Sequence, residues 1–101
     1  MTYLRQRVPP YVSKKLRDFA RGQDCTLQLE GICNRNPETT VLCHMRYFGM
    51  AGVAMKPHDF FAYHGCSDCH AHEKEAGWDE LLRAMMQTQA RVYARFGTLT
   101  P

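Results

Sequence analysis

The sequence has no hydrophobic run long enough to cross a membrane, since none approaches about 18 consecutive apolar residues. Its first ten residues also lack the apolar segment of a secretory signal peptide. We therefore expect no membrane partner and a cytoplasmic location. A chain of 101 residues is enough for one domain with a small core.

Acidic residues are scarce near the N-terminus. Residues 1–21 carry six basic side chains and one acid, Asp18, so this segment has a net charge of +5 while the whole chain has +3. A basic segment of this kind attracts nucleic acid, although it also fits the solvated face of a helix. We interpret residues 1–12 as a basic leader and residues 13–101 as a single domain.

Internal repeats and low-complexity tracts are absent, and the residue pattern predicts a small α+β domain. Ser13 is a suitable N-cap for a first helix, and Gly22 is suited to end it. Helices are predicted over residues 13–21, from about 69 to 76, and over 78–96, and strands over 26–29, 39–44 and 60–64. The last helix is the longest, and its apolar stripe predicts core packing; that stripe comprises Trp78, Leu81, Leu82, Met85, Val92, Tyr93 and Phe96.

Five cysteines in a chain expected in the cytoplasm favour metal binding over disulfide bonds, because that compartment keeps thiols reduced and an odd number cannot pair fully. Cys66 and Cys69 form a C-x2-C pair at the expected start of a helix. Cys25 and Cys33 flank the first predicted strand and its turn, as the ends of a hairpin. Four thiolates match the tetrahedral preference of structural Zn²⁺.

Two histidines and an arginine are candidates for chemistry on a phosphate. His44 ends a predicted strand, Arg46 follows it, and His70 comes directly after Cys69. A neutral imidazole can take a proton from water, and arginine can bind phosphate through two hydrogen bonds. Each histidine also fits a simple surface or strand-end position. Cys43 is interpreted as a small buried side chain, and His72 and Glu73 are further possible ligands.

These motifs resemble a known group of proteins. The combination of Cys25, Cys33, His44-Met-Arg46 and Cys66-Ser-Asp-Cys-His70 is similar to the treble-clef, or ββα-metal, fold of HNH endonucleases. More narrowly, residues 16–75 resemble the YbcO-like nucleases of lambdoid prophages and, more distantly, a RecA-dependent HNH nuclease of a phage. The resemblance implies a metal-dependent enzyme that hydrolyses DNA in a bacterial or phage-infected cell.

Residue roles follow from the same resemblance. His44 would be the general base, and His70 would bind a catalytic Mg²⁺ or Mn²⁺ ion while the four cysteines hold zinc. Arg46 is our own candidate for a phosphate contact. The sequence departs from the HNH pattern because Cys43 stands where a metal ligand usually precedes the base. It also has no asparagine between His44 and His70, so His58 or Asp59 would have to substitute.

Two other functions remain open. The first is a non-catalytic zinc module that binds DNA or a recombination protein through its basic segment. In the second, the chain holds a single metal in which a histidine replaces one cysteine. Both a monomer and a homodimer paired through the last helix are compatible with the sequence.

Overall fold

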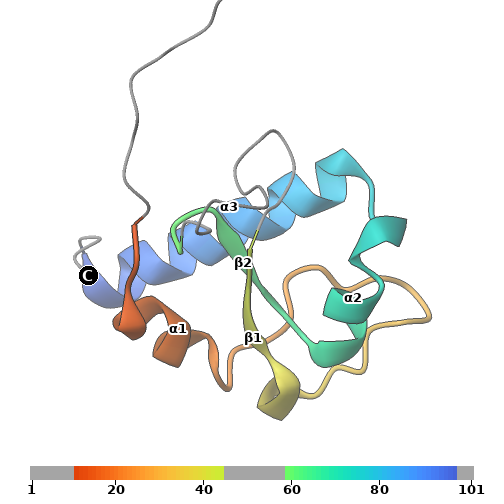
Figure 1. The fold of residues 1–101 in the computed structure, drawn as a ribbon, viewed down its shortest axis with the longest axis horizontal. Helices are drawn as coiled ribbons and strands as arrows, with labels where there is room; N and C mark the ends of the chain where they lie inside the picture. Colours follow the sequence, from red (N-terminus) through yellow and green to blue (C-terminus); the bar gives the residue numbers. More distant parts are fainter. Residues whose placement is uncertain (1–10, 45–58, 98–101) are drawn as a thin grey trace, which may run out of the picture.

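The computed structural model describes residues 11–44 and 59–97 as an α+β fold with one two-stranded antiparallel sheet. In Figure 1 the sheet lies between α1 and α2, and the long helix α3 crosses the sheet and packs against β2. In chain order, the elements are α1 (Lys14–Ala20), η1 (Pro37–Thr39), β1 (Val41–His44), β2 (Ala62–Gly65), α2 (Ser67–Ala71), η2 (Glu73–Glu75) and α3 (Trp78–Phe96). The α+β class and the long C-terminal helix are confirmed.

Helix α1 begins where its capping residue predicts. The hydroxyl of Ser13 accepts a hydrogen bond from the backbone N–H of Leu16 at 3.2 Å, which satisfies one of the free donors at the start of the helix. Leu16 and Ala20 are buried. The aromatic ring of Phe19 packs edge-on against Phe96 of α3, with ring centroids 5.3 Å apart. These contacts fix α1 against the C-terminal end of α3.

The two strands pair with Cys43 opposite Tyr63 and with His44 opposite Ala62. Because successive side chains of a strand point to opposite faces, Cys43 and Tyr63 share one face and His44 points to the other. Both strands are shorter than predicted. The first starts at Val41 because Pro37–Thr39 forms a 3₁₀ turn capped by Asn36, and the second is Ala62–Gly65.

The predicted strand at residues 26–29 is wrong. Gln28 has a φ of +49°, which turns the backbone out of an extended conformation. The contacts of this segment with the sheet are hydrogen bonds from Thr26 to His64. Thr26 donates its N–H to the carbonyl of His64 at 2.7 Å. Leu27 and Leu29 are buried in the core, so their alternating hydrophobicity reflects burial in a loop.

Helix α2 also differs from its predicted bounds. Its N-cap is Cys66, whose sulfur accepts a hydrogen bond from the N–H of Cys69 at 3.3 Å. The helix ends at Ala71, and a separate 3₁₀ turn follows at Glu73–Glu75. The predicted start near Cys69 is two residues late, because the prediction takes Ser67 or Asp68 as the cap.

Helix α3 has its predicted bounds and ends at Gly97, which has a φ of +73°. Its buried side is narrower than predicted, and its buried residues are Leu81, Ala84, Thr88 and Val92. Trp78, Leu82 and Tyr93 were assigned to the core but are 51%, 39% and 69% exposed. Within the described residues, no helix is both long and apolar enough to cross a membrane.

Candidate metal centre and histidine sites

The four predicted cysteine ligands converge in space. The sulfur atoms of Cys25, Cys33, Cys66 and Cys69 all lie within 4.8 Å of one another. Cys33 is partly exposed and the other three are buried. No other group of three or more possible ligands is this close within residues 11–44 and 59–97. The sulfurs come from the loop after α1 and from the start of α2, so the cluster joins two distant parts of the chain.

Backbone N–H groups point at these sulfurs. Gln28 donates to Cys25 and Leu29 donates to Cys69, each at 3.4 Å. The left-handed backbone at Gln28 lets two successive N–H groups reach two different cysteines. A neutral thiol is a weak acceptor, whereas a thiolate is stabilised by N–H donors. The backbone of this loop therefore stabilises the ionised form of Cys25 and Cys69.

Protonation of the cluster is uneven. Burial opposes ionisation of Cys66, but the N–H groups of Cys69 and Asn34 outweigh it and lower the pKa of Cys66 to about 7. Burial raises the pKa of Cys69 and of Cys33 above the usual range. A divalent cation among the sulfurs would favour the ionised form of all four.

The geometry fits zinc. Zn–S bonds of about 2.3 Å in a tetrahedron require sulfurs about 3.8 Å apart. The sulfurs of Cys33 and Cys66 are 3.9 Å apart, and the remaining separations of up to 4.8 Å need only a small contraction.

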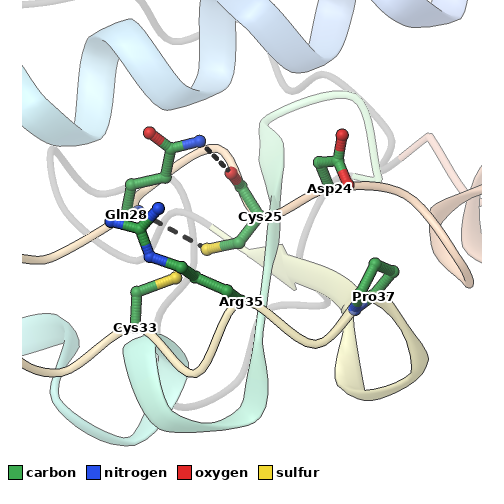
Figure 2. Close-up of a pocket in the computed structure, with 6 residues that line it drawn as sticks. All are labelled: Asp24, Cys25, Gln28, Cys33, Arg35 and Pro37. Carbon is green, nitrogen blue, oxygen red and sulfur yellow. Dashed lines mark hydrogen bonds between the residues drawn. The ribbon is translucent and has the colours of Figure 1, made fainter.

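A hollow of about 180 Å³ adjoins Cys25 and Cys33; its other lining residues are Asp24, Gln28, Arg35 and Pro37 (Figure 2).

His44 is paired with a buried carboxylate. Its Nε2 lies 2.7 Å from Oδ1 of Asp59, which is 5% exposed. The second carboxylate oxygen accepts a hydrogen bond from the N–H of Ser13 at 2.6 Å and lies 3.5 Å from Nε of Arg17. A carboxylate at Nε2 favours the tautomer protonated there, which leaves the lone pair on Nδ1. This pair has the arrangement of an oriented base.

Sequence reasoning considered Asp59 only as a substitute for a missing asparagine. It did not foresee the pairing with His44, because the two residues are separated by the fourteen residues 45–58. The contact depends on α1, because the N–H of its N-cap Ser13 and the side chain of Arg17 hold the other carboxylate oxygen. A local pattern in the sequence therefore does not predict the contact between His44 and Asp59.

His70 lies among different neighbours. Its Nδ1 is 3.6 Å from Oε1 of Glu73, and the same oxygen accepts a hydrogen bond from the hydroxyl of Tyr63. Tyr63 shares a sheet face with Cys43, opposite to the face of His44. The described contacts therefore do not bring His44 and His70 together, and His70 lies outside the four-sulfur cluster.

The remaining candidates have varied positions. Cys43 is buried, and burial raises its pKa to about 12, which keeps it a neutral thiol. His72 is exposed and its Nδ1 lies 3.0 Å from the carbonyl of Asp68. Arg46 and His58 lie outside the described residues, as do residues 1–10 of the predicted leader.

Sequence reasoning assigned no role to His64, which is fully buried in β2. Its Nδ1 faces the guanidinium of Arg91 at 3.2 Å, and its ring packs edge-on against Phe19. Burial and the nearby Arg91 charge lower the pKa of His64 to about 4. It is a neutral core residue that links the sheet to α1 and α3.

Comparisons with known proteins agree with this picture. The family model described as "Putative nuclease YbcO" matches residues 14–98. Two proteins of that name, from Escherichia coli K12 and Enterobacteria phage 82, are each 42% identical over 82 aligned residues, covering 73% of this chain and 85% of the relative. A solved structure, titled as a putative bacteriophage protein from Escherichia coli K-12, aligns with a TM-score of 0.61 and 32% identity. That alignment covers 82% of this chain and all of the other. The chain thus belongs to the YbcO nuclease family.

Proposed function

We propose that this protein is an HNH-type endonuclease that hydrolyses DNA phosphodiester bonds, with His44 as its general base. The observation that carries the proposal is the 2.7 Å contact between His44 Nε2 and the buried Asp59 carboxylate. A buried carboxylate at one ring nitrogen fixes the orientation of the ring and makes the other nitrogen more basic. Family membership supports the reaction class, and the enzyme would act in the cytoplasm of a bacterial or phage-infected cell.

The reaction would begin with transfer of a proton from water to Nδ1 of His44. The resulting hydroxide attacks the phosphorus, the bond from phosphorus to the leaving oxygen breaks, and that oxygen takes a proton from solvent. Asp59 stabilises the imidazolium that forms on His44, as an acid partner does in other histidine bases. The proton is then released to water, which restores the neutral base.

Two metal roles belong to this proposal. Zinc held by the four cysteines would be structural, because a closed four-thiolate shell leaves no position for a substrate. His70 would hold Mg²⁺ or Mn²⁺, with the carboxylate of Glu73 beside it. A divalent cation held there would polarise a phosphate oxygen and stabilise the leaving oxygen. This role comes from the family resemblance, because the described contacts do not bring His70 next to His44.

The test is a plasmid-nicking assay in Mg²⁺ and in Mn²⁺, made on protein whose zinc content per chain has been measured. We expect His44→Ala to lower the rate about 10² to 10⁴-fold with zinc content unchanged. His72→Ala is a matched control, because it removes an exposed histidine whose ring contacts the backbone carbonyl of Asp68. Nicking by His44→Ala at the rate of the unmodified protein would reject the assignment of the base.

A second function has its own support. His44 lies on the sheet face opposite to that of Tyr63, and the hydroxyl of Tyr63 binds the Glu73 carboxylate that lies beside His70. The described residues form no ligand cluster besides the four cysteines. This arrangement fits a non-catalytic zinc module that binds DNA or a recombination protein. Zinc at one ion per chain, DNA binding and no cleavage of plasmid, linear or branched DNA would favour this module.

A further inference from the structure

Helix α1 presents a basic ridge to solvent. Lys14, Arg17 and Arg21 are spaced three and four residues apart, so they lie on the same side of the helix, away from the buried Leu16 and Ala20. All three are exposed. The ridge extends about 10 Å along the helix axis, given a rise of about 1.5 Å per residue.

The three cations lie close enough to act together on one acidic side chain. Asp18 lies among them and accepts a hydrogen bond from Lys14 at 2.7 Å. This bond, with the charges of Lys14, Arg21 and Arg17, lowers the pKa of Asp18 below its usual value. Two carboxylates, Asp18 and Asp59, lie against the three cations, so the ridge keeps an excess of one positive charge.

The ridge adjoins the pair formed by His44 and Asp59. Nε of Arg17 lies 3.5 Å from Asp59 Oδ2 and 3.4 Å from the carbonyl of Ser13. The guanidinium thus touches the carboxylate that holds His44, while the side chain is 52% exposed. An arginine oriented through Nε still presents its terminal N–H groups, which is the geometry used to bind phosphate.

The helix is held firmly in this place. Phe19 packs against both Phe96 and His64, with centroids 5.3 and 5.6 Å apart. At the other end, Asp59 accepts the N–H of Ser13 and donates its own N–H to the carbonyl of Tyr11. The ridge therefore keeps a fixed position relative to His44.

From this arrangement we infer that the ridge of Lys14, Arg17 and Arg21 binds the phosphate backbone of DNA and that Arg17 holds the phosphate beside His44. The inference rests on the proposed nuclease function, because it names the surface that brings substrate to that site. It assigns to α1 the phosphate contact that sequence reasoning gave to Arg46. The partner is the DNA backbone because the exposed cations of this surface complement the negative charge of its phosphates.

Binding of a 20-base-pair duplex to the His44→Ala protein, measured without Mg²⁺ or Mn²⁺ at several salt concentrations, tests the surface apart from cleavage. Each lost phosphate contact reduces the slope of log affinity against log salt by about 0.9. We expect this reduction for Arg17→Gln and for Arg21→Gln, and recovery in Arg17→Lys. Lys15→Gln is the control, because it makes the same charge change on the same helix away from the ridge.

Asp18→Asn gives a test of opposite sign. Removing the acid from the ridge should tighten duplex binding, while helix α1 keeps its Ser13 cap. Unchanged affinity and salt slope in both Arg→Gln variants, or equal losses in Lys15→Gln, would overturn the inference. If the slopes change as expected but the unmodified protein cuts no DNA, the binding surface stands and the proposed nuclease function fails.

Discussion

Cys43 and His44 are adjacent in β1, yet their side chains lie on opposite faces of the sheet. Cys43 is 1% exposed and contacts the carbonyl of Gly65 at 3.8 Å, whereas His44 meets Asp59 on the side of α1. The residue before the proposed base thus belongs to the core. Its burial and high pKa make it a poor metal ligand. His44 instead contacts Asp59, whose other oxygen is held by Ser13 and Arg17.

Asp59→Asn should lower the rate of DNA cleavage by about 10 to 100-fold, the usual effect of losing a group that orients a histidine. The amide keeps the shape of the carboxylate but loses the charge that stabilises a protonated His44. A nicking assay over a range of pH, with thermal unfolding alongside, separates this effect from a loss of fold. Full activity in a stably folded Asp59→Asn would show that the pair does not serve the reaction.

Cys69→Ser should abolish tight zinc binding and unfold much of the chain, since structural zinc contributes on the order of 10 kcal/mol to folding in such sites. Cys43→Ala is the matched control: it removes a buried cysteine outside the cluster and should keep one zinc per chain. Mass spectrometry under native conditions and circular dichroism measure both quantities. Loss of zinc in Cys43→Ala would mean that the fifth cysteine takes part in binding.

Tyr63→Phe removes a buried hydroxyl that donates to Glu73 while keeping the aromatic ring in the core. The loss of the bond and the unpaired carboxylate oxygen should cost about 1 to 3 kcal/mol. Thermal unfolding should therefore shift down by several degrees, with zinc content unchanged. An unchanged melting temperature would indicate that water replaces the hydroxyl without cost.

Gly65→Ala should destabilise the fold because the register leaves no room for a side chain. A Cβ at this position would lie 2.7 Å from Cε2 of Tyr63 and 3.0 Å from the sulfur of Cys43. Overpacking of this kind typically costs about 1 to 3 kcal/mol. Gly22→Ala is the comparison, because nothing lies within 4 Å of its added Cβ and only the φ of +83° opposes it. Denaturant unfolding of the two variants measures the difference.

Sequence patterns predicted the features that depend on short-range chemistry. The cap at Ser13, the stop at Gly97 and the bounds of α3 each follow from a few neighbouring residues. The clustering of the four cysteines was also foreseen, because their ligand chemistry limits what they can do together. The resemblance of the motifs to the YbcO family predicted the family to which the chain belongs.

The errors come from tertiary context. Residues 26–29 alternate in hydrophobicity like a strand, but Gln28 takes a left-handed conformation so that N–H groups reach two sulfurs. The outer half of the α3 stripe was assigned to the core because periodicity does not show how wide the buried face is. The pairing of His44 with Asp59 depends on where α1 packs, which no spacing along the chain encodes.

The contact between His44 and Asp59 joins two residues that lie fifteen positions apart in the sequence. Closing a loop costs free energy that grows slowly with length, about 0.6 kcal/mol for each doubling. Insertions or deletions between positions 44 and 59 should therefore leave the pair intact.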